Sequence, residues 1–230
     1  MNPLQLILGD EEFLIDRATS SIIRAVRSTM QSNPEELPIT KLRAGDVTPS
    51  EISELLSPSL FAEDRVVILA AAGEAGKEAV STIEQAVKEP APGVVLIVIH
   101  SGGGRAKNLV KILKNAGADV TECPKLTKFS EREDFVVNEF RNLGVRPSRD
   151  TVHALLDAIG GDLRELASAV SQLVADTGGR VDPAAVRRYY AGIAGVTGFQ
   201  VADETIAGNT AAALASLRWA LVGGLSLIHI

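Results

Sequence analysis

The chain has 230 residues, and its 23 basic and 29 acidic side chains give a formal net charge of −6. Hydrophobic residues make up 46% of it and charged residues 23%, which excludes a disordered or collagen-like chain. The single cysteine, Cys123, excludes an internal disulfide, and the acidic balance argues against non-specific DNA binding by this chain alone. No apolar run is long enough to span a bilayer and no signal peptide opens the chain, so we expect a cytoplasmic protein without a membrane partner.

The first half of the chain alternates between short apolar runs and helical periodicity. The apolar runs predict five strands, near residues 4–8, 37–43, 65–70, 94–99 and 118–122. Helices are expected between them, over residues 10–30, 48–57, 74–88 and 107–115. The run Val94–Ile99 is apolar at every position, which is typical of a strand covered on both faces. We therefore predict a three-layer α/β domain with a five-stranded parallel sheet.

Beyond about residue 128 only helical patterns follow. A capping-box pattern at Ser130–Glu133 predicts a helix to Asn142. Further helices are expected over residues 148–159, 163–175, 183–190 and 201–221. We divide the chain into an α/β domain at 1–142, a small helical domain at 143–196 and the start of another helical domain at 197–224. Residues 225–230 look like translated sequencing-adapter sequence, so we expect a non-native tail on a truncated gene.

The residues that nucleotide chemistry needs are missing from their usual positions. The turn after the first strand, Gly9–Glu12, carries three carboxylates where a phosphate-binding loop carries a lysine. The histidines are dispersed without metal-ligand spacing, so we expect neither a cofactor nor a metal. Gly102–Arg105 is interpreted as a surface loop, with an anion-binding nest as the alternative. A nucleotide-binding ATPase or another α/β enzyme stays open as the alternative function.

Several segments resemble one family. Leu6–Leu14 resembles the opening of the delta subunit of the bacterial DNA polymerase III clamp loader. Val98–His100 with the glycines after it, Gly117–Val120 and Gly160–Leu166 resemble later segments of that family, in the same order. The resemblance implies an AAA+-like α/β domain without a working nucleotide site, a helical lid domain and a helical collar domain. It implies a non-catalytic subunit whose partners are the sliding clamp, other clamp-loader subunits and, through the complex, primer–template DNA.

The resemblance also implies a binding element. In the family, a Ser-Leu-Phe loop before the third strand enters a hydrophobic pocket on the sliding clamp. Pro58, Ser59, Leu60 and Phe61 occupy this position here, and Leu60 and Phe61 match residue by residue. Two adjacent large apolar side chains on a loop suit a binding anchor. The alternative is that both side chains simply cover the domain core.

Two basic features have a structural and a functional interpretation. Arg105, Lys107, Lys111 and Lys114 partly follow helical spacing, and we expect a solvated face. Contact with DNA or a neighbouring subunit is the alternative. The resemblance puts Arg164 where nucleotide-binding relatives sense phosphate, and we expect a surface or interdomain residue there. Since the chain ends soon after the collar would begin, we expect it to assemble poorly.

Overall fold

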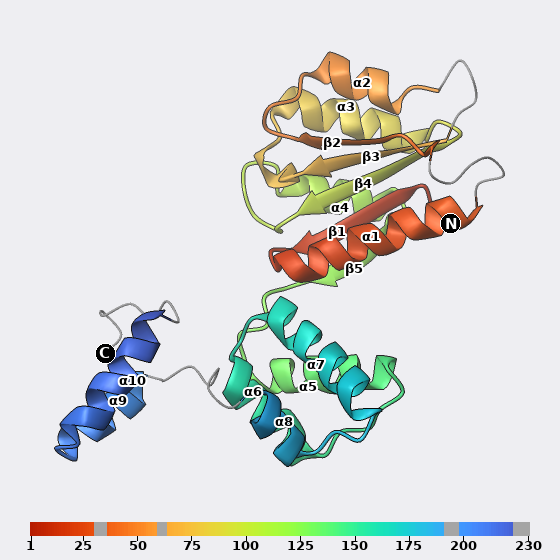
Figure 1. The fold of residues 1–230 in the computed structure, drawn as a ribbon. Coiled ribbons are helices and arrows are strands. Elements are labelled where there is room, and N and C mark those ends of the chain that lie inside the picture. The colour runs from red at the N-terminus through yellow and green to blue at the C-terminus, as the bar shows by residue number, and fades with distance from the viewer. Residues whose placement is uncertain (30–35, 59–63, 191–197, 223–230) are drawn as a thin grey trace. The chain divides into compact units, whose positions relative to one another are not determined.

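The computed structural model describes residues 1–29, 36–58, 64–190 and 198–222. They belong to two compact units, Met1–Lys125 and Leu126–Ile230. Figure 1 colours the chain by residue number, from red at the N-terminus to blue at the C-terminus. Within these described ranges, no helix combines the length and the apolar content needed to cross a membrane. The suspected tail at 225–230 lies outside the described residues.

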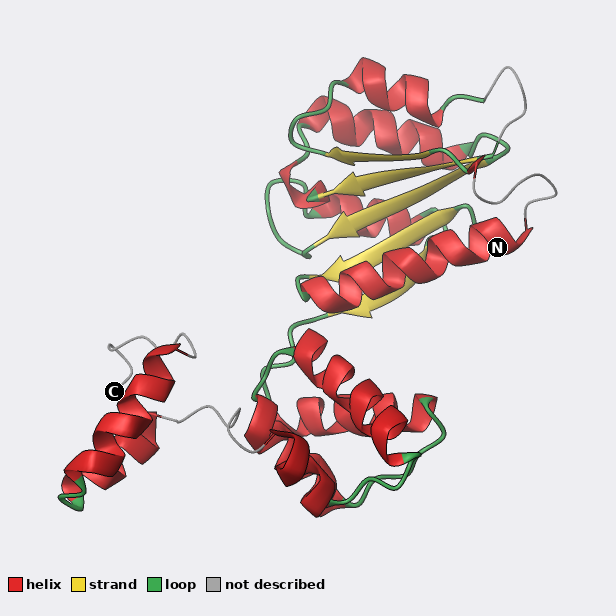
Figure 2. Cartoon of the chain, in the orientation of Figure 1, coloured by secondary structure: helices red, strands yellow, loops and turns green. Residues whose placement is uncertain are grey.

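The first unit is built on a parallel sheet of five strands, as predicted (Figure 2). The strands are β1 (Leu4–Gly9), β2 (Ile39–Arg43), β3 (Arg65–Ala70), β4 (Val94–His100) and β5 (Asp119–Cys123). Their order is β2-β3-β4-β1-β5, so the sheet is completed by the last strand pairing with the first. In this register Leu6 of β1 lies opposite Val98 on one side and Val120 on the other.

Helices cover both faces of the sheet, which confirms the three-layer α/β class. The helices of this unit are α1 (Glu12–Thr29), α2 (Pro49–Leu56), α3 (Lys77–Lys88) and α4 (Asn108–Asn115). One hydrophobic cluster joins α2, α3 and α4 to the sheet and includes Ile52, Ile83 and Leu109. A second cluster, on the face of α1, includes Ile22 and Val26. Burial on both faces explains the uninterrupted apolar run of β4.

Two of the predicted helix starts in this unit had different outcomes. Thr48 caps α2 and Glu51 completes a capping box, so the helix starts where the sequence predicted it. The third helix begins at Lys77 rather than near Glu74. Ala71 adopts a left-handed conformation (φ 51°), and the short 3₁₀ helix η2 (Ala72–Glu74) follows it. The chain therefore turns away from β3 before α3 can start.

The second unit is entirely helical in its described residues. Its helices are α5 (Phe129–Asn142), α6 (Arg149–Ile159), α7 (Leu163–Thr177), α8 (Pro183–Tyr190), α9 (Gly198–Ile206) and α10 (Thr210–Val222). The side chains of Ser148 and Asp162 accept hydrogen bonds from the first turns of α6 and α7, at Thr151 N and Glu165 N. The last two helices, α9 and α10, pack against each other, and the hydroxyl of Ser216 donates to Glu204.

Helix α5 corrects two of our expectations. The sequence pattern predicts this helix at the end of the α/β domain, with a boundary after residue 142, but the compact units divide between Lys125 and Leu126. The physical reason is that α5 packs on α6 and α7, which buries Phe135, Val136 and Phe140. The helix also starts earlier than its capping-box pattern suggested. Glu131 accepts hydrogen bonds from the amides of Thr127 and Lys128, so Ser130 lies inside the helix.

Candidate functional site

The loop that follows α2 has its two ends tied together. Pro58 is exposed, whereas Ser59, Leu60 and Phe61 fall outside the described residues. At the end of α2, the Ser57 hydroxyl donates to Ser53 O at 2.6 Å. The guanidinium of Arg65, at the start of β3, donates to Ser57 O. The chain from Ser57 to Arg65 is therefore closed at its base by a contact between side chain and backbone.

This loop belongs to the amino edge of the sheet. It precedes β3, and all strands of a parallel sheet begin at the same edge. Ligands of such sheets bind at the opposite, carboxyl edge. The described ends of this loop, Pro58 and Arg65, therefore belong to the edge opposite the one at which a nucleotide would be held.

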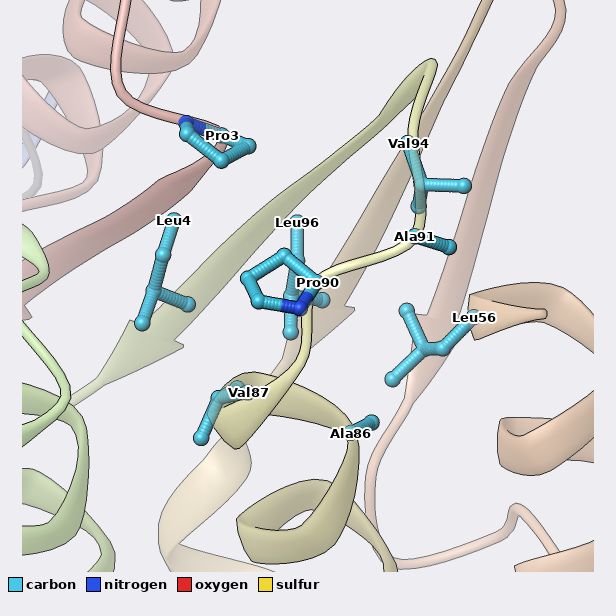
Figure 3. A pocket seen from close by; sticks show the side chains of 9 residues that line it. All are labelled: Pro3, Leu4, Leu56, Ala86, Val87, Pro90, Ala91, Val94 and Leu96. Carbon is cyan, nitrogen blue, oxygen red and sulfur yellow. The ribbon is translucent and has the colours of Figure 1, made fainter. Parts of the chain in front are cut away.

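A small apolar pocket lies at the same amino edge (Figure 3). Leu56 of α2, Leu4 of β1 and Leu96 of β4 contribute side chains to its lining. The remaining lining residues are Pro3, Ala86, Val87, Pro90, Ala91 and Val94. The pocket has about 20 Å³ of space, little more than one water molecule needs. It therefore suits the anchoring of the last turn of α2 rather than the binding of a ligand.

The carboxyl edge is closed where a phosphate-binding loop would lie. Gly9 ends β1 with φ +148°, and a Cβ there would stand 1.9 Å from Cys123 O. The amide of Glu11 donates to the same carbonyl oxygen at 3.1 Å. Phosphate-binding loops use free backbone amides at this turn. Here the end of β5 engages the Glu11 amide, and the exposed carboxylates of Asp10 and Glu12 flank it.

The loops after β3 and β4 interlock. His100 is fully buried, its Nδ1 accepts from Gly102 N at 2.8 Å, and its Nε2 lies 3.2 Å from Ala106 O. A Cβ on Gly104 would stand 2.5 Å from Gly73 O, so the two loops touch through their backbones. Because His100 already engages the Gly102 amide, the contacts favour the surface-loop interpretation over the anion nest.

The basic stripe is exposed along α4, as expected for a solvated face. Lys107 and Lys111 are exposed, and Lys114 lies 3.7 Å from the Glu122 carboxylate. Arg105 donates from Nε to Glu74 O, which ties the loop after β4 to η2. Contact of this stripe with DNA stays a hypothesis.

The remaining candidates for a functional role are Cys123 and Arg164, and the structure gives neither of them a catalytic or ligand-binding environment. Cys123 is buried at the end of β5, and burial, followed by the charge of Glu122, raises the pKa of its thiol. Such a thiol is poorly suited to nucleophilic chemistry. Arg164 is exposed on α7. No group of His, Cys, Asp and Glu that could hold a metal occurs in the part of the chain that the structure describes.

Sequence reasoning missed three residues that shape these edges. Arg65 closes the base of the loop, Glu74 receives the side chains of both Arg43 and Arg105, and Arg132 holds the beginning of the helical unit. Glu74 lies 31 residues from each of its two partners, whereas Arg65 and Arg132 reach back 8 and 6 residues to backbone carbonyls. Local periodicity carries no signal of such contacts.

The sheet order, the three layers and the helices that follow define an AAA+-like module. A family model described as "DNA polymerase III, delta subunit" matches residues 6–124, just over half of the chain. The chain therefore belongs to the DNA polymerase III delta subunit family. No curated protein matches the sequence.

One solved structure shares this fold, and a second aligns with it only weakly. The DNA clamp loader delta protein YqeN of Bacillus subtilis aligns with a TM-score of 0.74 and 20% identity, over 97% of this chain and 68% of that one. The RuvB Holliday junction branch migration motor of Thermotoga maritima aligns with a TM-score of only 0.44 and 11% identity, over 80% of this chain and 60% of that one.

Proposed function

We propose that this chain acts as a clamp-loader delta subunit, which binds the sliding clamp through Leu60 and Phe61 and helps to open the ring for loading onto primed DNA. The observation that carries the proposal is the family match over residues 6–124, which includes the whole segment Pro58–Phe61. The exposure of Pro58, the one described residue of this segment, supports the proposal.

The anchor obtains its binding energy from two apolar side chains. Burying a leucine and a phenylalanine contributes roughly 3–6 kcal/mol before ordering costs are subtracted. Pro58 restricts the backbone at one end of the loop, and the contact between Arg65 and Ser57 O restricts the base. Both restraints lower the entropy that the loop loses on binding. A loop that binds the open ring better than the closed ring shifts the ring toward opening.

The chain performs no catalysis in this proposal. The Glu11 amide is engaged by Cys123 O, and three carboxylates follow Gly9, so the turn after β1 is unsuited to phosphate. ATP binding by neighbouring loader subunits would control when the loop is exposed. Those subunits are reached through the helical segment 197–224, and primer–template DNA is contacted mainly through the assembled complex. The alternative, an AAA+-type ATPase or another α/β enzyme, is supported by the general fold alone.

The test is a binding titration of the whole chain with the sliding clamp of the same organism, in the absence of nucleotide. We expect saturable binding that ATP does not change, and no ATP binding in a parallel titration by calorimetry. Saturable ATP binding without clamp binding would favour the enzyme alternative.

A further inference from the structure

His100, the last residue of β4, is a buried histidine that the proposed function does not use. Its Nδ1 accepts the amide hydrogen of Gly102 at 2.8 Å, and its Nε2 lies 3.2 Å from the carbonyl oxygen of Ala106. A ring nitrogen that accepts an amide hydrogen carries no proton of its own. A carbonyl oxygen can only accept a hydrogen bond, so the single proton of the neutral ring belongs on Nε2.

The two partners of the ring belong to the same loop, which connects β4 to α4. Gly102 lies near the beginning of this loop with a φ of +89°, and Ala106 lies buried near its end. The amide of Ala106 donates to Gly73 O at 3.0 Å, and Gly73 belongs to the loop after β3. His100 therefore holds this loop near both of its ends, and Ala106 connects it to the loop after β3.

The two loops approach each other too closely for any side chain at their contact. A Cβ on Gly73 would stand 2.7 Å from Gly103 O and 3.5 Å from Cε1 of His100. A Cβ on Gly104 would stand 2.5 Å from Gly73 O. Open parallel sheets commonly bind a ligand between the loops at this edge. Here the loops after β3 and β4 contact each other instead.

We propose that His100, as the neutral tautomer with its proton on Nε2, holds the loops after β3 and β4 together and takes the place of a ligand at this part of the carboxyl edge. It is a positioning residue, because it acts through Gly102 and Ala106. The ring supplies one acceptor and one donor, and the glycines at 102–104 allow the close approach of the backbones. This role uses no residue of the loop that follows α2, so it does not depend on clamp binding.

The first measurement is the long-range ¹H–¹⁵N NMR spectrum of the histidine rings in the whole, ¹⁵N-labelled chain at neutral pH. This spectrum distinguishes a protonated from a non-protonated ring nitrogen. The chain has three histidines, so His153→Gln and His229→Gln identify the signals of His100 by removing the other two. We expect a non-protonated Nδ1 and a protonated Nε2, both unchanged when ATP is added. A protonated Nδ1, or His100 signals that shift with ATP, would overturn the proposal.

The second measurement separates the two hydrogen bonds of the ring by amide hydrogen exchange. His100→Asn keeps an acceptor near the position of Nδ1, and His100→Gln keeps a donor near the position of Nε2. We expect exchange of the Gly102 amide to become about five- to tenfold faster in the Gln variant alone, and that of the Ala106 amide in the Asn variant alone, as the loss of one hydrogen bond predicts.

The matched control is His153→Gln, in the helical unit, which should change neither amide. Exchange at Gly102 and Ala106 that is the same in the unmodified chain and in both His100 variants would show that the ring does not hold the loop. The measurement of the tautomer needs no substitution at His100, so it decides the proposal even if neither His100 variant folds.

Discussion

Gly9 shows how a single residue closes the carboxyl edge of the sheet. The sequence predicts a turn at this position, and the carboxylates of Asp10, Glu11 and Glu12 indicate that it does not bind phosphate. The contact with Cys123 O was not predictable, because it depends on β5 pairing with β1. Strand order is set by the packing of the whole domain, and local periodicity does not specify it.

Gly9→Ala should destabilise the protein far more than a glycine change in open space. The new Cβ would stand 1.9 Å from Cys123 O at a φ of +148°, and backbone has to move to admit it. We expect a loss of about 3 kcal/mol or more in the free energy of unfolding, measured with urea. Gly117→Ala is the control. Gly117 also has a positive φ, +85°, but a Cβ added there would meet nothing within 4 Å. It should cost only about 1–2 kcal/mol of backbone strain, and equal losses would contradict the close contact.

At the scale of elements, α2 and α5 show when a local sequence pattern is enough to predict where a helix starts. For α2, Thr48, Pro49 and Glu51 all indicate the same start, and the helix begins there. For α5, Glu131 caps the backbone amides of Thr127 and Lys128 without a Ser or Thr at the N-cap. A pattern that requires a hydroxyl at the cap therefore shifted the predicted start to Ser130.

The capping box of α2 predicts a pH-dependent contribution to stability. Glu51 accepts from Thr48 N at 2.8 Å and from Thr48 Oγ1 at 2.7 Å, and these hydrogen bonds, the backbone one foremost, lower the pKa of its carboxyl below 4.5. A lowered pKa in the folded state means that the stabilisation is complete above pH 4.5 and is lost as the pH falls through the folded value. Glu51→Gln should therefore lower the urea midpoint at pH 7, and by less at pH 3.

Two further variants serve as a control and a comparison for the Glu51→Gln measurement. Glu54→Gln, on the exposed face of the same helix, should leave the midpoint unchanged at both pH values. Thr48→Ala should cost about 1 kcal/mol at pH 7, the usual value of an N-cap side chain. A Glu51→Gln effect that is the same at pH 3 and pH 7 would show that the ionised carboxylate contributes nothing to the cap.

At the scale of the whole molecule, the class of fold was predictable and the boundary between its parts was not. Alternating apolar runs and helical patterns indicated the parallel sheet, because each buried strand carries its own signal. The assignment of α5 depended on which unit covers Phe135, Val136 and Phe140, and the helix pattern alone does not identify the covering surface. Likewise, the choice of Pro58–Phe61 as the anchor came from resemblance to a family.

The boundary can be tested with two fragments. Residues 1–125 should fold cooperatively, because both hydrophobic clusters of the sheet lie within them. Residues 1–142 should fold equally well but carry α5 without α6 and α7, which exposes its apolar face. We expect this longer fragment to bind a hydrophobic dye and to self-associate in sedimentation, whereas the shorter one does neither. Clean, monomeric behaviour of 1–142 alone would return α5 to the α/β domain.

The most direct test of the account is the affinity of the sliding clamp for the whole chain carrying Leu60→Ala and Phe61→Ala together. The matched control is Ile206→Ala with Leu214→Ala, which removes two exposed apolar side chains from the last helices. We predict that the first variant weakens clamp binding by about 100-fold or more without changing the melting temperature, since a factor of ten corresponds to about 1.4 kcal/mol. The control should bind like the unmodified chain. Equal affinity of all three proteins would contradict the proposed role of Leu60 and Phe61.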